Sequence, residues 1–375
     1  MDEHPYSLGA RWILSLLGDP LENHWINIAD GKIESFSVKP AYPLIRHLGE
    51  HSVVLPRTIS AHAHLELSQL EAPLNVPSRS MHDWVSALLA FRQSKKYNAA
   101  VGIQKALRRP EFVKSTAAVA DIVPFEQTTE NPHSSYPINK AFPKGEETVL
   151  WLPFTELIGW RKDLVPDSVP TSFGLSPHAP HTVCPTLLEK AIDQNVPVAM
   201  HLAETLEELQ LLRYHTGPLL TMMQHADADY DPKFVLLGKR PLDYLQLLSS
   251  APSVFIIHGN YLDDEELQFL AAHRDTMSVV YCPRSHAYFR HSAYPLQKML
   301  DKEVRVLLGT DSLASVSDLN LLEDMHYVLE HHPGVPPDVV YRMGTVEGAS
   351  ALNLLQEGFG TLQLGNLARF ACFYQ

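Results

Sequence analysis

The apolar positions of this chain fall into short runs that alternate with segments of helical period. Each run is rich in apolar and β-branched residues, and we expect each to form a strand. They cover Val53–Ile59, Ala117–Val123, Thr148–Phe154, Ser172–Ser176, Val196–Met200, Ser253–Ile257, Met277–Tyr281 and Val304–Leu308. Parallel strands that are buried on both faces have this near-continuous apolar character, so the pattern predicts a parallel sheet covered by helices.

The segments between most of these runs are amphipathic with helical period. They are Met81–Ala106, Pro185–Gln194, Leu206–His215, Asp263–Ala272, Leu296–Lys302 and Leu319–Leu329. Eight strands with helices after most of them favour a closed (β/α)8 TIM barrel of the α/β class. Two connections depart from the repeat. We expect a loop over Phe125–Glu146 and at most one short turn within Glu156–Pro170.

The two ends of the chain have a different pattern. Near the N-terminus, the alternating segment Trp25-Ile-Asn-Ile is followed by Asp30-Gly-Lys, which is typical of a strand and a turn. Near the C-terminus, Gly360-Thr-Leu and Ala368–Phe373 predict another strand pair. Neither end could bury a core alone. We therefore predict one small β domain from residues 1–52 together with 345–375, and a barrel over residues 53–344.

Composition and charge narrow the class of protein. The 375 residues include 30 Lys and Arg against 43 Asp and Glu, a formal charge of −13 that argues against binding to nucleic acid. Three cysteines without a CxxC pair favour a reducing compartment, and no apolar run is long enough to span a membrane. The acidic N-terminus does not resemble a signal peptide. We expect a cytoplasmic protein without a membrane partner, in which a homo-oligomer stays open.

Ligand-capable residues stand at the ends of several predicted strands. His62-Ala-His64 follows the first, His201 ends the fifth, His258 ends the sixth and Asp311 follows the eighth. A single His-x-His pair carries little weight, because a chain with 20 histidines contains roughly one by chance. Together, however, these residues mark the C-terminal ends of barrel strands, where barrel enzymes keep their active sites.

Three imidazoles and one carboxylate, with no thiolate, suit one divalent metal, Zn or Fe(II). Such an ion lowers the pKa of water from about 15.7 to about 7. Glu204, three residues after His201, is placed to carry a proton from that water to the substrate, and His258 to orient the water. The pattern predicts metal-assisted hydrolysis of a small-molecule substrate at an electrophilic carbon.

Five ordered strings resemble the amidohydrolase superfamily, and in particular its cytosine deaminase and triazine hydrolase branch. They are Leu175-Ser-Pro-His178-Ala-Pro, His201-Leu-Ala-Glu204, His258-Gly-Asn, Tyr281-Cys-Pro-Arg-Ser285 and Gly309-Thr-Asp311-Ser. The continuation of the second string to Glu208 also resembles the aminodeoxyfutalosine deaminases. The resemblance covers roughly residues 8–370. It implies a TIM barrel with a small β domain and a metal-dependent hydrolase.

By this resemblance, the metal ligands correspond to His62, His64, His201 and Asp311. Glu204 corresponds to the proton shuttle, and His258 and Asp311 complete the catalytic set. The substrate contacts correspond to Glu66, His178, Ser285 and His286, the last where many relatives have Asn. Binuclear members bridge two metals with a lysine from the fourth strand, which lacks one here, so the resemblance implies one metal.

The expected reaction is deamination of an amino-substituted N-heterocycle. Glu204 favours this reaction, because departing ammonia needs a proton. The alternatives are hydrolysis of a C–Cl, amide or guanidine-type bond on the same scaffold, and a catalytically silent member of the superfamily.

Overall fold

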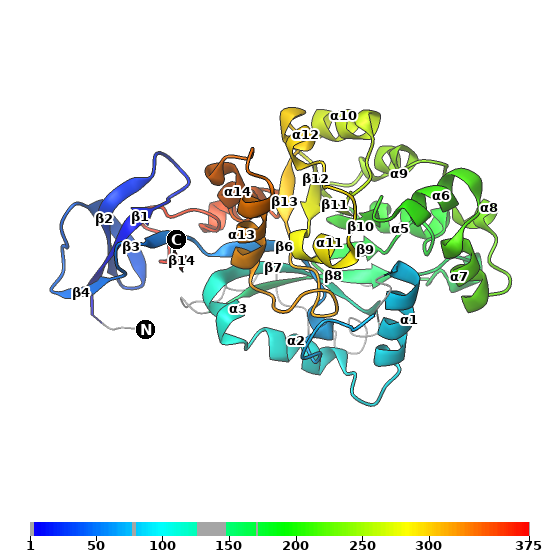
Figure 1. Ribbon diagram of the computed structural model, residues 1–375, viewed down its shortest axis with the longest axis horizontal. Coiled ribbons are helices and arrows are strands. Elements are labelled where there is room, and N and C mark those ends of the chain that lie inside the picture. The colour runs from blue at the N-terminus through cyan, green and yellow to red at the C-terminus, as the bar shows by residue number, and fades with distance from the viewer. Residues whose placement is uncertain (1–3, 77–79, 126–147, 170–171, 375) are drawn as a thin grey trace.

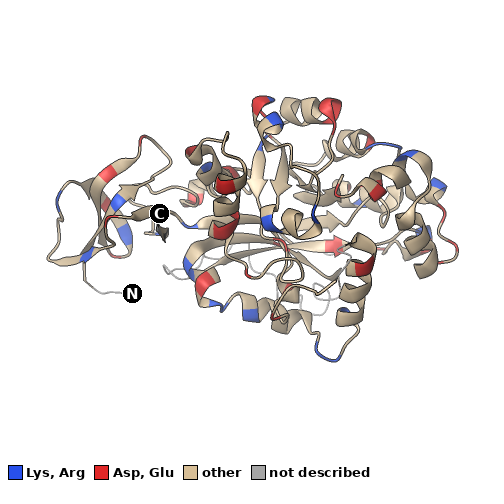
Figure 2. Ribbon diagram, in the orientation of Figure 1, with Lys and Arg blue, Asp and Glu red and all other residues tan. Residues whose placement is uncertain are grey.

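The computed structural model describes residues 4–76, 80–125, 148–169 and 172–374. Its strands form two separate sheets, a six-stranded sheet at one end of the molecule and an eight-stranded sheet surrounded by helices (Figure 1). Acidic and basic residues are interspersed over the part of the chain that Figure 2 colours. Among the described helices, none is both long and apolar enough to cross a bilayer.

The smaller sheet is built from both ends of the chain, as predicted. Its strands run in the order β14-β5-β1-β2-β3, and β4 pairs with β1. Their bounds are Tyr6–Ile13 for β1, Leu21–Ala29 for β2, Lys32–Ser37 for β3, Leu44–His47 for β4, Ser52–Pro56 for β5 and Phe370–Tyr374 for β14. Asp30 and Gly31 both have positive φ and form the β2–β3 turn. The strand expected at Gly360-Thr-Leu is absent from this described region, so that prediction was wrong.

The larger sheet is the predicted barrel. Its strands, all parallel, follow one another in chain order from β6 to β13. They are β6 Thr58–Ala63, β7 Thr116–Val123, β8 Leu150–Leu157, β9 Gly174–Pro177, β10 Val198–Leu202, β11 Val254–His258, β12 Met277–Tyr281 and β13 Val306–Leu308. An isolated parallel bridge between Ala63 and Asp311 joins the two edges. This contact brings the first and last strands together and nearly closes the barrel.

The run predicted as the first barrel strand, Val53–Ile59, is in fact parts of two strands. β5 pairs with β14 in the small sheet, whereas β6 pairs with β7 in the barrel. Arg57 lies between them, and its guanidinium donates hydrogen bonds to the carbonyl oxygens of Val113 and Thr116. An apolar run shows that a segment is buried, but it does not show in which sheet.

Helices cover the outside of the barrel (Figure 1). After β6 come α1 Met81–Arg92, α2 Ala99–Ala106 and α3 Pro110–Ser115, and after β9 comes α5 Pro185–Asp193. The β10–β11 connection holds α6 Leu206–Tyr214, α7 Pro218–Ala226, α8 Pro232–Val235 and α9 Pro241–Leu248. The remaining helices are α10 Asp264–Ala272, α11 Pro283–Phe289, α12 Leu296–Asp301, α13 Leu321–His331, α14 Pro337–Met343 and α15 Val346–Ala351. Short 3₁₀ turns are η1 Leu65–Leu67, η3 Lys162–Leu164 and η4 Leu355–Glu357.

The helix predicted over Met81–Ala106 is two helices. α1 ends at Arg92, and α2 begins after Asn98, whose side chain accepts a hydrogen bond from the backbone N–H of Val101. This N-cap restarts the helix in a new direction. The expected loop over Phe125–Glu146 lies outside the described residues, apart from Phe125. In the described part of Glu156–Pro170 the only helical segment is η3, as predicted.

The alternation of side chains along the barrel strands sets up the site. In β8, Leu152 and Phe154 join the apolar cluster inside the barrel, whereas Leu157 joins the cluster under the outer helices. The next inward position after Phe154 is therefore Glu156. The division of the chain into residues 1–52 with 345–375 and residues 53–344 stays a prediction. Two observations concern the boundaries of this division. β5 pairs with β14 in the small sheet, and α15 contacts β6 and β13 of the barrel.

Candidate active site

Five side chains that the sequence singled out converge at the C-terminal ends of the barrel strands. His62 and His64 lie at the end of β6, His201 in β10, His258 at the end of β11 and Asp311 after β13. The ring centroid of His62 is 4.9 Å from that of His64, 5.0 Å from that of His201 and 5.8 Å from that of His258. Strands far apart in the sequence therefore deliver their polar ends to one place.

His62 is at the centre of this cluster and is fully buried. Neither of its ring nitrogens has a hydrogen-bond partner among the described residues, although buried polar atoms are nearly always paired. Burial, together with the charges of neighbouring histidines, lowers the pKa of His62 well below its ordinary value. A neutral imidazole with unpartnered nitrogens is the form of histidine that binds a cation.

The donor atoms around His62 form two overlapping sets. One atom each of His62, His64 and Asp311 lie within 4.8 Å of one another, and so do one atom each of His62, His201 and His258. His201 donates from Nδ1 to the carbonyl oxygen of His178 over 3.1 Å, which leaves its Nε2 free for a ligand. Imidazoles and a carboxylate at these separations fit a divalent cation of the zinc or iron type.

The carboxylate of Asp311 is held in place by two hydroxyl groups. Ser285 Oγ donates to Asp311 Oδ2 over 2.5 Å, and Ser315 Oγ donates to the same atom over 3.2 Å. The other oxygen, Oδ1, lies 3.9 Å from His62 Nε2. Burial raises the pKa of Asp311 to about 6, against the opposing effect of these hydrogen bonds. The hydroxyl of Ser285 is thus engaged with Asp311, and a contact between Ser285 and substrate stays a prediction.

Glu204 lies at the edge of the cluster. Its Oε1 is 3.5 Å from His258 Nε2, so the two groups can act on one small molecule between them. Burial, with Asp311 and Glu208 nearby, raises the pKa of Glu204 well above its ordinary value. The loop that carries Glu204 is fixed by Glu208, which accepts from the backbone N–H of Ala203 over 2.7 Å and from that of Glu204 over 3.1 Å.

Three residues at the mouth of the barrel adopt left-handed backbone conformations without being glycine. They are Ala203 with φ 53°, His258 with φ 66° and Asp311 with φ 61°. Such conformations are costly for a side chain with a Cβ and persist where surrounding contacts hold them. Each of the three has a hydrogen bond to another residue. Glu208 accepts from the backbone N–H of Ala203, Tyr294 donates to the carbonyl oxygen of His258, and Ser285 donates to the carboxylate of Asp311.

The sequence did not indicate these positioning roles of Glu208 and Tyr294. The hydroxyl of Tyr294 donates to the carbonyl oxygen of His258 over 2.9 Å, across 36 residues. Glu208 ends the string from His201 that resembles the aminodeoxyfutalosine deaminases. Its acceptance of two backbone N–H groups, however, follows from the left-handed turn at Ala203. Spacing along the chain carries no signal of that turn.

Glu66 is buried beside the cluster and forms an ion pair. Arg92 Nη2 lies 2.5 Å from Glu66 Oε1, whereas Glu66 Oε2 has no hydrogen-bond partner among the described residues. Burial raises the pKa of Glu66 to about 8, against the effect of Arg92. Arg92 lies at the end of α1, so this helix is tied to the loop that follows His64.

The other two predicted substrate contacts are also near the cluster. The ring of His178 is 5.0 Å from that of His201, and its Nδ1 is 2.9 Å from Thr182 Oγ1. His286 is on α11, and its buried Nε2 has no partner in the described part of the chain. Its ring is 5.3 Å from that of His291. Substrate contact by His178 and His286 stays a prediction.

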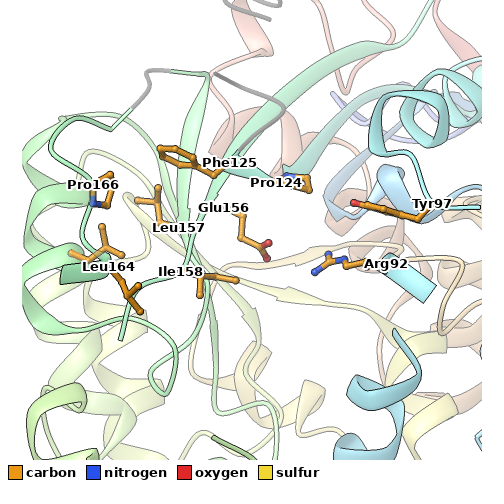
Figure 3. Close-up of a pocket in the computed structure, with 10 residues that line it drawn as sticks. Arg92, Tyr97, Pro124, Phe125, Glu156, Leu157, Ile158, Leu164 and Pro166 are labelled. Carbon is orange, nitrogen blue, oxygen red and sulfur yellow. The ribbon is translucent and has the colours of Figure 1, made fainter. Parts of the chain in front are cut away.

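A pocket of about 390 Å³ opens beside Arg92, at the ends of β7 and β8 (Figure 3). One side is polar and is formed by Arg92, Tyr97 and Glu156. The other side is apolar and includes Leu157, Leu164 and Leu187, together with Phe125 and Ile158. Because the pocket is at the same end of the barrel as the histidines, it can hold a part of a ligand whose other part reaches them.

The model of the amidohydrolase family matches residues 159–374, more than half of the chain. The chain belongs to the amidohydrolase family. The matched residues include the ends of β10, β11 and β13, where His201, His258 and Asp311 lie. The predicted superfamily and its barrel fold are therefore confirmed.

The curated relatives of this amidohydrolase bear deaminase names. A 5-methylthioadenosine/S-adenosylhomocysteine deaminase of Pyrococcus furiosus is 34% identical over 53% of this chain, but the match spans only 46% of that protein. An aminodeoxyfutalosine deaminase of Deinococcus radiodurans is 26% identical over 82% of this chain and 75% of its own length. A 5'-deoxyadenosine deaminase of Methanococcus maripaludis is 26% identical over 86% and 74%.

Solved structures share the fold. The Helicobacter pylori aminofutalosine deaminase in complex with methylthio-coformycin has a TM-score of 0.75 and 21% identity, covering 99% of this chain and 92% of its own. A triazine hydrolase from Arthobacter aurescens has a TM-score of 0.69 and 18% identity, over 99% and 87%. At these identities the likeness concerns the fold alone. The expected class, a hydrolase of C–N bonds, agrees with the family match and with the deaminase relatives, and the grouping of His62, His64, His201, His258 and Asp311 agrees with a divalent-metal site.

Proposed function

We propose that this amidohydrolase removes the amino group of an adenosine-type nucleoside and uses one divalent cation, zinc or iron(II). The predicted ligands of the cation are His62, His64, His201 and Asp311. The observation that carries the proposal is the position of Glu204, whose carboxyl group stands 3.5 Å from His258 Nε2 at the edge of the ligand cluster. A proton-carrying group is therefore next to the place where a nucleophile would be held.

A cation bound by these residues would supply the nucleophile, because divalent ions lower the pKa of water from about 15.7 to about 7. The protein holds the ligand side chains in their binding form, since burial lowers the pKa of His62 and of His64 well below the ordinary value. The hydrogen bond between His201 Nδ1 and the carbonyl oxygen of His178 fixes which nitrogen of His201 faces the cluster.

Glu204 and His258 divide the remaining work. His258 Nε2 and Glu204 Oε1 face each other, so His258 can orient the attacking water while Glu204 takes its proton. The same carboxyl group then delivers the proton to the departing amino group, which leaves as ammonia. Glu208 keeps Glu204 in place through the backbone N–H groups of residues 203 and 204.

The substrate class follows from what the relatives are named for. Those proteins act, by name, on 5-methylthioadenosine, S-adenosylhomocysteine, 5'-deoxyadenosine and aminodeoxyfutalosine. The pocket beside Arg92 adds about 390 Å³ for the part of such a molecule that lies beyond the heterocycle. A nucleoside therefore fits the site better than a free base. The cytoplasmic location stays a prediction, and a homo-oligomer stays open.

Metal content and ammonia release together test this proposal. The purified protein is expected to contain one equivalent of zinc or iron and to release ammonia from adenosine or its 5'-substituted forms. Chloride and carboxylate release from triazine, amide and guanidine substrates are measured in parallel. Larger rates there would favour the alternative reactions, and metal-free, inactive protein would favour a silent member.

The role of Glu204 is tested with Glu204→Gln. This variant is expected to lose about 10²- to 10⁴-fold in kcat, the usual contribution of a positioned acid–base group. Glu207→Gln is the matched control. It makes the same chemical change three residues away, at a glutamate that is exposed on α6. Full activity of Glu204→Gln would show that the proton is carried by another group.

A further inference from the structure

We propose that Glu156 reads the hydroxyl groups of the substrate at a subsite separate from the metal ligands. This inference rests on the proposed function, because it assigns the part of the nucleoside that does not react. Glu156 was not among the residues that the sequence singled out, since it stood at the start of a segment predicted to be a loop. In the structure it is the next-to-last residue of β8.

The side chain of Glu156 is aimed into the barrel mouth. It follows Leu152 and Phe154 on the inward face of β8, and in β-strands every second side chain points the same way. Only 7% of Glu156 is exposed. Its backbone belongs to the β8–β9 ladder, and its charge interacts with that of Arg92. Among the described residues, however, no hydrogen bond or close ion pair to the carboxylate is formed, although a buried carboxylate almost always has such a partner. A ligand is the natural source of the missing donors.

The surroundings of Glu156 define a pocket with two unlike walls. In Figure 3 its carboxylate points toward the guanidinium of Arg92, with Tyr97 beyond, and Leu157, Leu164 and Phe125 lie on the other side. Ile158 and Leu164 on the apolar side are 45% and 39% exposed, which is high for large apolar residues. The pocket therefore offers hydrogen bonds on one side and apolar contact on the other.

The charges in the pocket select a neutral group with hydroxyls. An anion would face the carboxylate of Glu156, while the guanidinium of Arg92 already donates to Glu66. A cation could pair with Glu156 but would be repelled by Arg92, which lines the same pocket. A hydroxyl both donates and accepts, so a pair of hydroxyls can donate to Glu156 and accept from Arg92.

The pocket and the predicted metal ligands lie at the same end of the barrel. β8, β9 and β10 are neighbours in the sheet, and two backbone hydrogen bonds link them, from His178 N to Leu157 O over 3.1 Å and from His201 N to His178 O over 2.9 Å. Two strand spacings separate the strands of Glu156 and His201, which is about 10 Å. One nucleoside can therefore present its base to the histidines and its sugar to Glu156.

The test compares substrates that differ only in hydroxyl groups. kcat/KM is measured for adenosine and 2',3'-dideoxyadenosine with the wild-type protein, Glu156→Gln and Glu189→Gln, the last being an exposed glutamate on α5 that serves as control. Wild type and control are expected to prefer adenosine by about 10- to 100-fold, as for a hydrogen bond to a charged group. In Glu156→Gln this preference is expected to fall to about threefold or less.

Binding to the metal-free protein gives a second readout that does not depend on turnover. Calorimetry with the same two nucleosides and with 3'-amino-3'-deoxyadenosine is expected to show the same Glu156-dependent preference for adenosine. An unchanged preference in Glu156→Gln, or tighter binding of the 3'-amino compound than of adenosine, would overturn the inference. Absence of ammonia release together with Glu156-dependent binding would instead overturn the proposed reaction and support the subsite.

Discussion

Replacing Glu208 by Gln separates the stability of this protein from its activity. Glu208 is 2% exposed and receives hydrogen bonds from the backbone N–H groups of Ala203 and Glu204. Burial raises its pKa from 4.5 to about 7, and the two hydrogen bonds oppose that rise only in part. The ionised carboxylate thus costs stability while it holds the loop of Glu204. Gln keeps the shape but has one carbonyl oxygen and no charge.

The effect on stability follows from proton linkage. Because the pKa of Glu208 is higher in the folded than in the unfolded state, the folded protein binds more protons between about pH 4.5 and pH 7. The wild type therefore loses stability over this interval as the pH rises. A pKa of about 7 instead of 4.5 corresponds to about 3 kcal/mol. Glu208→Gln lacks this loss, so relative to wild type it should gain about 2.5 kcal/mol between pH 5 and pH 8.5.

The effect on activity has the opposite sign. Above pH 7 the wild-type carboxylate can accept both N–H groups, whereas Gln leaves one of them without a full acceptor. Glu204 then shifts relative to His258, and a displacement of about 1 Å can cost about 10²-fold in rate. We expect Glu208→Gln to lower kcat at pH 8 by about 10- to 100-fold, with KM little changed.

Urea unfolding at a series of pH values and steady-state kinetics at pH 8 measure both effects. Glu207→Gln is the control, because Glu207 is exposed and its loss should leave both curves parallel to those of the wild type. The reasoning is refuted if the free energies of unfolding of wild type and Glu208→Gln keep a constant difference from pH 5 to pH 8.5. Unchanged kcat in Glu208→Gln would refute the positioning role separately.

Two further predictions concern His258 and the cation. Tyr294→Phe removes the donor to the carbonyl oxygen of His258 but keeps the ring stacked on Tyr281 at 3.6 Å, so urea unfolding should show a loss of about 1–3 kcal/mol; an unchanged free energy of unfolding would contradict this contact. Chelation with EDTA should lower Tm, and added zinc should restore it. At a zinc concentration one hundred times Kd, the free energy of unfolding should rise by about 2.7 kcal/mol. In His62→Ala added zinc should leave Tm unchanged, and an equal rise would exclude His62 as a ligand.

The sequence predicted the barrel and the ends of its strands because both are local properties. Apolar runs mark buried strands, and the residue after each run is at the mouth whichever helices surround it. His201, His258 and Asp311 could therefore be placed at one end of the barrel without knowledge of their distances. The same reasoning failed at Val53–Ile59, where one apolar run contributes to two sheets.

The tertiary structure decided the contacts that hold these residues and the pocket beside them. The left-handed backbone at Ala203 and His258 is stabilised by Glu208 and Tyr294, and nothing in the local sequence specifies those pairs. The inward direction of Glu156 depends on where β8 ends, three residues later than its apolar pattern indicates. Hydrophobic patterning acts along the chain, whereas hydrogen-bond geometry and the charge balance of a cavity arise only when distant strands meet.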